Sequence, residues 1–298
     1  MAEKIVIAGA TGNLGTRIAH ALSKRGADVV ALGRIGAPAN KLKALESLRV
    51  KIRIVDMASV SDLAKECDGA ACVVSVLAGL RDVIVDTQSI VLEAALAACV
   101  PRFIPSDYSM DFPKQPDGEN RNLDLRREFH RRLDAAPIAS TSIFNGPFGE
   151  VLTMYNHVPL LDFNQKMVGY WEDPDWRIGF TTMNDVAEYT AAAALDQRAP
   201  RALRIASFSA SPRELAKFTA DVMRTPFQLV RLGGLEDLRA QNKSERAAHP
   251  EGEKELYPLW QVGQYMLSMF SIRHAPNDND RYPGLKWTSL ADLVAQRS

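Results

Sequence analysis

The chain has 298 residues, of which 46% are hydrophobic and 24% are charged, the composition of a globular protein with one large domain or two smaller ones. Its 36 lysine and arginine residues balance 36 aspartate and glutamate residues, which argues against partners bound through summed positive charge, such as nucleic acid or an anionic membrane surface. Three cysteines are too few for a disulfide framework or a structural zinc site, and no apolar stretch is long enough to cross a bilayer. These features predict a cytoplasmic protein without a metal site.

Short apolar segments alternate with segments of helical length through the first half of the chain. Strands are predicted at residues 4–8, 28–32, 50–55, 70–76, 102–105 and 139–143, and helices at 13–24, 40–48, 60–67, 82–98 and 122–135. Parallel strands joined by helices form a sheet covered on both faces, and strands that are apolar throughout agree with that burial. The predicted fold class is α/β, with a Rossmann-type doubly wound parallel sheet.

The alternation loosens after about residue 150. A helix is predicted at 184–195, a strand at 203–208 and a second helix after Ser211, with Glu214 at the capping-box position. A polar segment at 236–249 precedes a long, aromatic-rich segment at 253–272. We expect residues 1–150 to form an NAD(P)-binding domain and residues 151–298 a smaller α/β substrate-binding domain. Residues 177–208 are expected to return to the first domain.

The segment from Gly9 to Gly15 carries three glycines directly after the first predicted strand and at the start of a helix. Gly9 allows a tight turn, Gly12 lets the backbone approach a pyrophosphate, and Gly15 lets the helix pack against the strand. The helix N-terminus then offers free amides to phosphate groups. The spacing is G-x-x-G-x-x-G, which differs from the strict dinucleotide fingerprint, but its position in the alternating pattern predicts a dinucleotide site.

Arg34 ends the second predicted strand, where an acidic residue would hold the ribose hydroxyls of NAD. An arginine at this position suits a 2′-phosphate, so we expect NADPH or NADP as the cofactor, with Lys41 adding positive charge nearby. Asp56 follows the third strand, where a carboxylate can lie near the adenine amino group. It can equally cap the helix that starts near Ser59, and both interpretations stay open.

The sequence resembles the isoflavone reductase-like and NmrA-like group, an atypical branch of the short-chain dehydrogenases. The matching segments are residues 6–15, Arg34 with Lys41, Gln88, residues 102–107, residues 144–148 and the C-terminal segment 282–289. The resemblance implies a Rossmann domain followed by a small substrate domain. It further implies that Gly9, Thr11, Gly12, Asn13, Leu14, Arg34 and Lys41 bind the dinucleotide, and that Gln88, Pro105, Ser106, Asn145, Pro147 and Phe148 lie near its nicotinamide end.

Reductases of this group carry a lysine as general acid or base on the helix after the fifth strand. Alignment from Ile138 places Arg126 at that position. A guanidinium stays protonated near pH 7, so Arg126 could orient a substrate or stabilise an oxyanion but could not exchange a proton. The basic segment 126–132 also fits an ordinary solvated helix face. Tyr108 and His157 are further candidates for proton transfer, although each also fits a structural role.

Two functions remain open. The first is an NADPH-dependent reductase of a small, aromatic, quinone-like or phenylpropanoid-like substrate, acting by hydride transfer. The second is a non-catalytic NADP(H)-binding redox sensor or regulator of the NmrA-like type. Either protein would bind a small molecule, without nucleic acid or membrane, as a monomer or a homodimer.

Overall fold

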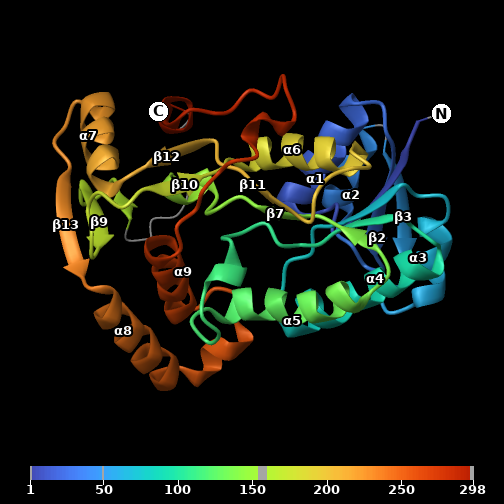
Figure 1. The fold of residues 1–298 in the computed structure, drawn as a ribbon, viewed down its shortest axis with the longest axis horizontal. Helices are drawn as coiled ribbons and strands as arrows, with labels where there is room; N and C mark the ends of the chain where they lie inside the picture. Colours follow the sequence, from blue (N-terminus) through green and yellow to red (C-terminus); the bar gives the residue numbers. More distant parts are fainter. Residues whose placement is uncertain (1, 49, 154–159, 296–298) are drawn as a thin grey trace.

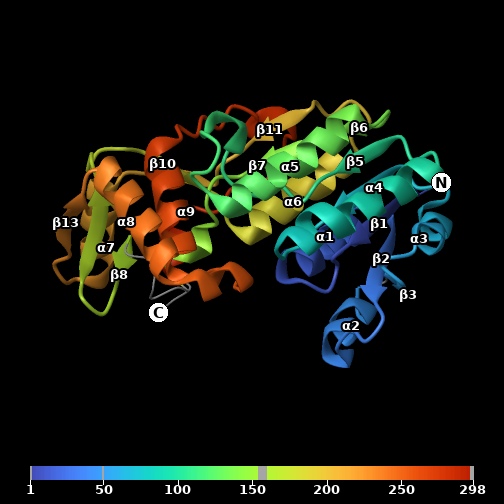
Figure 2. The ribbon, with the colours of Figure 1, turned by 90° about the horizontal axis from the view of Figure 1, so that it is seen from below.

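The computed structural model describes residues 2–48, 50–153 and 160–295. The molecule is elongated, with the Rossmann sheet and its helices at one end (Figure 1). A second part lies at the other end, built around α7 (Pro212–Met223), α8 (Leu235–Ala248) and α9 (Leu259–Ser271). Figure 2 shows α8 and α9 far from α2 (Ala39–Glu46) and α3 (Val60–Cys67) along the long axis of the molecule. No helix within the described ranges is long and apolar enough to cross a lipid bilayer.

A six-stranded parallel sheet forms the first part, in the order β3-β2-β1-β4-β5-β6. Its strands are β1 (Lys4–Ala8), β2 (Asp28–Arg34), β3 (Lys51–Val55), β4 (Cys72–Ser75), β5 (Arg102–Ile104) and β6 (Ala139–Ser140). On β1, Ile5 pairs with Val29 on one side and with Cys72 on the other. The strand order therefore reverses at β1 and β4, where sheets of this kind open a crevice at the carboxyl ends of their strands. The predicted fold class is confirmed.

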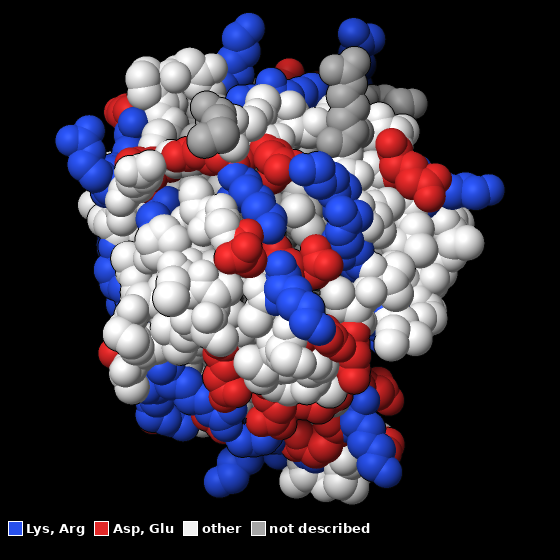
Figure 3. All heavy atoms as spheres, turned by 90° about the vertical axis from the view of Figure 1, so that its right-hand side faces the viewer, with Lys and Arg blue, Asp and Glu red and all other residues white. Residues whose placement is uncertain are grey.

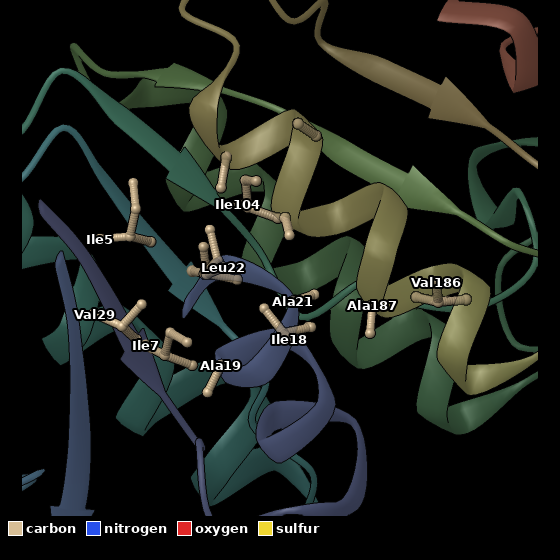
Figure 4. Packing of buried hydrophobic residues seen from close by; sticks show 14 of the residues in the cluster. Ile5, Ile7, Ile18, Ala19, Ala21, Leu22, Val29, Ile104, Val186 and Ala187 are labelled. Carbon is tan, nitrogen blue, oxygen red and sulfur yellow. The ribbon is translucent and has the colours of Figure 1, made fainter. Parts of the chain in front are cut away.

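Alternate residues of the central strands supply two cores on opposite faces of the sheet. Ile5 and Ile7 pack against α1 (Asn13–Lys24) and α6 (Met183–Leu195), as Figure 4 shows with Ile18 of α1 and Ala187 of α6. Val6 and Ala8 point the other way, towards α3 (Val60–Cys67), α4 (Gln88–Ala97) and α5 (Arg121–Ala135). The short helix α2 (Ala39–Glu46) follows β2. This period of two is what fully buried strands require.

Two predicted elements of the first part differ in detail. The helix expected at 82–98 begins with a π-helical turn, Asp82–Thr87, before α4. The strand expected at 139–143 is divided at Thr141: β6 pairs with β5, whereas β7 (Ser142–Phe144) pairs in parallel with β11 (Ala202–Arg204). The strands β5 and β11 lie on opposite sides of this segment, because Thr141 N donates to Phe103 O and the next amide, Ser142 N, donates to Arg201 O.

Within its described residues, the second part contains two small sheets and a third hydrophobic core. The sheets are β13-β9-β8 and β10-β12, built from β8 (Leu161–Asp162), β9 (Met167–Trp171), β10 (Ile178–Phe180), β12 (Phe208–Ala210) and β13 (Gln228–Gly233). The helices are α7 (Pro212–Met223), α8 (Leu235–Ala248), α9 (Leu259–Ser271) and α10 (Leu290–Ala295). The strand expected at 203–208 is thus two separate strands, β11 and β12. The long segment expected at 253–272 becomes helical at Leu259, after Pro258.

The predicted capping box of α7 is confirmed. Ser211 Oγ accepts a hydrogen bond from Glu214 N at 3.2 Å, and Ser211 N donates to Glu214 Oε2 at 2.8 Å.

The C-terminal segment returns to the first part and crosses α6. Tyr189 Oη donates to Asp278 O at 2.6 Å, and the Tyr282 and Trp287 rings lie 4.9 and 5.9 Å from the Tyr189 ring. The family-like segment 282–289 therefore packs as a strap on this helix. Because α6 also packs on α1, and β11 pairs with β7, we propose that residues 177–208 belong with residues 1–150. We propose that residues 151–298 otherwise form the second domain, apart from the strap at 282–289.

Charges of both signs are interspersed on the face at the Rossmann end of the molecule (Figure 3). The surface in this view carries no single extended patch of lysine and arginine.

Candidate active site

The glycine loop joins β1 to α1 at the carboxyl edge of the sheet. Gly9 has φ +90°, and a Cβ there would lie 2.4 Å from Val76 O; a Cβ on Gly15 would lie 2.3 Å from Gly9 O. Gly12, by contrast, is exposed, and its Cβ would meet only Gly9 O, at 3.3 Å. Gly9 and Gly15 are therefore required by the protein's own packing, whereas the space in front of Gly12 is open to a ligand.

The first turn of α1 is suited to an anion. Its N-cap is Gly12, which offers no side chain to the free amides, and the turn contains no acidic residue. These amides and the helix dipole favour a phosphate. Asn13 is exposed beside them, while Thr11 and Leu14 are half-buried. The residues present thus fit the pyrophosphate of a dinucleotide.

Arg34 ends β2 at the same edge of the sheet, and its side chain is exposed. Neither Arg34 nor Lys41 on α2 forms an ion pair with any residue that the structure describes. Two apolar side chains lie exposed on neighbouring segments, Ile35 at 71% and Ile54 at 50%. Unpaired cations next to exposed apolar surface fit a nucleotide that carries an extra phosphate.

Asp56 follows β3 and is exposed. Its Oδ1 accepts a hydrogen bond from Ala58 N at 2.9 Å, within the turn that precedes α3. The cap of α3 is Ser59, whose Oγ accepts from Asp62 N at 3.2 Å. The alternative in which Asp56 caps this helix is therefore wrong, and a contact with the adenine remains a proposal.

The loop after β5 is tied to the π-helical turn by Gln88. Ser106 N donates to Gln88 Oε1 at 2.8 Å, and Gln88 Nε2 donates to Ile84 O at 2.8 Å. The side chain of Gln88 therefore joins the π-helical turn to the loop after β5. Ser106 Oγ also donates to Leu77 O at 2.6 Å, so the loops after β4 and β5 are joined. Pro105 is buried beside them.

Arg126 projects from α5 onto the same loop. Its Nε donates to Ser106 O at 3.1 Å and its Nη1 donates to Asn122 O at 2.8 Å. Arg127 is also engaged, since its Nη2 donates to Phe112 O and Gln115 O, both at 2.7 Å. The interpretation of the basic segment as a solvated face is therefore wrong for these two arginines. The structure brings Arg126, Gln88 and Ser106 together at the loop that follows β5.

The turn after β7 combines one buried polar residue with two half-buried apolar residues. Asn145 is fully buried, with its backbone N donating to Ser109 O at 3.0 Å and its carbonyl accepting from Thr181 Oγ1 at 2.6 Å. Pro147 and Phe148 are only half-buried. Asn145 thus shapes the turn, and Pro147 and Phe148 are the members of this turn that retain accessible surface.

The sequence matches the NmrA-like family over residues 1–226. The chain belongs to the NmrA-like family. This confirms the family resemblance seen in the sequence.

Relatives and solved structures of similar fold are reductases. A bifunctional pinoresinol-lariciresinol reductase from Linum corymbulosum is 25% identical over 98% of this chain and 96% of its own length. An isoflavone reductase homolog from Zea mays is 29% identical over 66% of each chain. A crystal structure of isoflavone reductase matches with a TM-score of 0.81 at 18% identity, over 100% of both chains. AtPrR2 with NADP+ and (+)-pinoresinol matches with a TM-score of 0.80 at 20% identity, over 100% of this chain and 99% of that one.

This NmrA-like chain places Tyr108, one of the two other candidate proton donors, in the core and not in the cluster around Arg126. Tyr108 is buried in the core between the sheet and α6, where burial raises the pKa of its hydroxyl far above the usual range. Its Oη has no hydrogen-bond partner among the described atoms. This placement argues against Tyr108 as a proton donor. His157 lies outside the described residues.

Three polar residues of this NmrA-like site escaped the sequence analysis. His130 stands one helical turn after Arg126, and its Nε2 lies 2.7 Å from Oδ2 of the buried Asp107. Arg17, one turn after Asn13, reaches back to the glycine loop. The i, i+4 spacings were visible signals, but a helical spacing alone does not indicate which face meets the site. No group of three or more His, Cys, Asp or Glu side chains in the described ranges is arranged to hold a metal ion.

Proposed function

We propose that this NmrA-like chain is an NADPH-dependent reductase of a small aromatic substrate of the quinone or phenylpropanoid class. The observation that carries the proposal is the Arg126 guanidinium, held against Ser106 O in the loop after β5, at the same carboxyl edge of the parallel sheet as the open glycine loop. The family membership and the reductases among the similar proteins support it.

The proposed cofactor site lies along the carboxyl edge of the sheet. The loop residues Gly9 to Gly15, with the amides of α1, would hold the pyrophosphate, and Arg34 with Lys41 would hold the 2′-phosphate. Asp56 would lie near the adenine. Gln88, Pro105, Ser106, Asn145, Pro147 and Phe148 would shape the nicotinamide end. When bound there, NADPH supplies a hydride from C4 of its nicotinamide.

Arg126 would act on the substrate through charge. A guanidinium stays protonated at neutral pH, so Arg126 cannot deliver a proton and recover one during turnover. Two backbone carbonyls fix the plane of the guanidinium, and Nη2 forms no hydrogen bond with the described residues. A preorganised donor of this kind stabilises negative charge that develops on a substrate oxygen. Protonation of the product would then come from water.

A second candidate is an NADP(H)-binding sensor without turnover. The specific observation in its favour is that Tyr108 is buried in the core, so this residue does not supply a proton donor to the cluster of Arg126, Gln88 and Ser106. A substrate whose reduced form is stable as an anion would not need such a group.

The deciding experiment is oxidation of NADPH with a panel of quinones, aromatic enones and benzylic ethers. We expect turnover of at least one class, with a rate lowered by about 10²-fold in Arg126→Ala and largely retained in Arg126→Lys. Arg131→Ala is the matched control, because Arg131 is exposed on the same helix. Tight NADPH binding without turnover of any panel member would favour the sensor. Equal rates in wild type and Arg126→Ala would remove Arg126 from the site.

We further propose a cytoplasmic protein that acts as a monomer or a homodimer. Sedimentation of the purified chain distinguishes the two assemblies.

A further inference from the structure

Arg17 bridges the first turns of two helices. Its Nε donates to Asn13 Oδ1 at 2.9 Å, and its Nη1 donates to Asn184 Oδ1. Asn13 is the first residue of α1 and Asn184 the second of α6, and these two helices pack side by side in the core (Figure 4). Side chains on a helix lean towards its N-terminus, which is why a residue in the second turn of α1 reaches the glycine loop.

The charge of Arg17 is not balanced by a nearby carboxylate. Both of its partners are neutral amides, and no acidic side chain of the described chain forms an ion pair with it. The acidic residues of α6 are engaged elsewhere: Asp185 accepts from Thr288 N at 2.9 Å, and Glu188 pairs with Arg25 at 2.5 Å.

The position of this cation is itself unfavourable without an anion. The N-terminal end of a helix carries a partial positive charge, and a further cation beside it raises the electrostatic energy. Arg17 lies beside two such ends. At α6, the side chain of Thr182 accepts from Asp185 N and Glu150 Oε1 accepts from Met183 N at 2.9 Å, so this end is already capped. At α1, no side chain caps the amides next to Gly12. The uncompensated positive charge is therefore concentrated at the glycine loop.

We propose that Arg17 is a second anchor for the diphosphate of the dinucleotide, beside the amides at the start of α1. Asn13 and Asn184 orient the guanidinium, and Nη2 forms no hydrogen bond with the described residues, so it is free to donate to a phosphate oxygen. The inference rests on the proposed binding of NADP(H), but not on the proposed reaction.

Arg17 and Arg34 then serve different parts of the cofactor. The diphosphate is common to NADPH, NADH and ADP-ribose, whereas the 2′-phosphate is present only in NADPH. A charge on the diphosphate changes the affinity for all three ligands by the same factor. A charge on the 2′-phosphate changes the ratio between NADPH and NADH.

The test measures dissociation constants of NADPH, NADH and ADP-ribose for wild type, Arg17→Met and Arg34→Ala by calorimetry. We expect Arg17→Met to raise the dissociation constants of all three ligands by about tenfold. The ratio of the NADPH and NADH dissociation constants should stay unchanged. Arg25→Met is the control at the far end of α1, where Arg25 is the C-cap residue, and it should leave all three constants within twofold. The midpoint of thermal unfolding shows that each variant is folded.

A variant of Asn184 separates ligand binding from a structural role. Asn184→Ala removes the contact between the helices but keeps the charge of Arg17, so its dissociation constants should stay within about threefold of wild type if the charge acts directly. A loss in Asn184→Ala equal to that in Arg17→Met would mean that Arg17 only joins α1 to α6, and the proposal would be wrong. Unchanged constants in Arg17→Met, or a loss confined to NADPH, would also overturn it. Failure of wild type to bind any of the three ligands would instead overturn the proposed function together with this inference.

Discussion

His130 Nε2 lies 2.7 Å from Asp107 Oδ2, and both side chains are buried. One turn earlier on α5, Arg126 donates to the carbonyl of Ser106. Two residues spaced i, i+4 on one helix thus hold two consecutive residues of the loop after β5. The buried pair thereby positions the helix that carries the proposed oxyanion-stabilising charge.

Loss of this pair should destabilise the protein in a pH-dependent way. Burial alone would raise the pKa of Asp107, but the charge and hydrogen bond of His130, with Ser142 and Arg126, hold this pKa below its usual range. A lowered folded-state pKa contributes stability above the unfolded value, about 3.9, and this contribution is lost as the pH falls through the folded value. Asp107→Asn should lower the free energy of unfolding at pH 7 by about 3 kcal/mol.

Urea unfolding between pH 7 and pH 3 checks this expectation. The difference between wild type and Asp107→Asn should shrink at the acid end of the series. Asp117→Asn provides the control, because Asp117 is largely exposed although it contacts Arg127. A difference that stays constant with pH would mean that the Asp107 charge does not stabilise the fold.

Arg34→Ala should reduce the preference for NADPH. We expect wild type to bind NADPH at least about tenfold more tightly than NADH, about 1.4 kcal/mol, because the charge-assisted contact with the 2′-phosphate has no counterpart in NADH. Fluorescence titration of both cofactors measures the ratio, which should approach one in the variant. Equal affinities in wild type would contradict the assignment of Arg34.

Gly12→Val should abolish cofactor binding and leave the protein folded. The new side chain would occupy the open space in front of the loop, where its Cβ meets only Gly9 O at 3.3 Å. Gly15→Ala is the informative contrast, since its Cβ would lie 2.3 Å from Gly9 O and 2.8 Å from Ala10 Cα, so it should disturb folding itself. Calorimetry with circular dichroism separates the two effects. Micromolar binding by Gly12→Val would show that the loop does not hold phosphate.

Gln88→Met should destabilise the protein by about 2 kcal/mol, because Ser106 N and Ile84 O would both lose their buried partner. Chemical denaturation measures the change. Gln197→Met serves as the control at an exposed glutamine, where the effect should stay within about 0.5 kcal/mol. An unchanged free energy of unfolding in Gln88→Met would indicate that water replaces the side-chain amide at the π-helical turn.

Local patterns were sufficient for the strands and helices of the Rossmann sheet. Apolar runs and glycines act over a few residues, so the loop from Gly9 to Gly15 and the strand end at Arg34 were visible before any packing was known. The same reasoning placed the capping box at Ser211 and Glu214, which depends on residues three apart.

Other features depend on contacts between residues distant in the chain. Arg17 meets Asn184 across 167 positions, and His130 meets Asp107 across 23. Which side of α5 faces the loop after β5 follows from how the helix docks on the sheet, so the inward position of Arg126 could not be read from a basic run. The burial of Tyr108 has the same origin. Tyr108 lies in the loop after β5, but the packing of α6 on the sheet encloses its ring in the core. Periodicity describes the faces of an element, and only the docking of elements determines what each face meets.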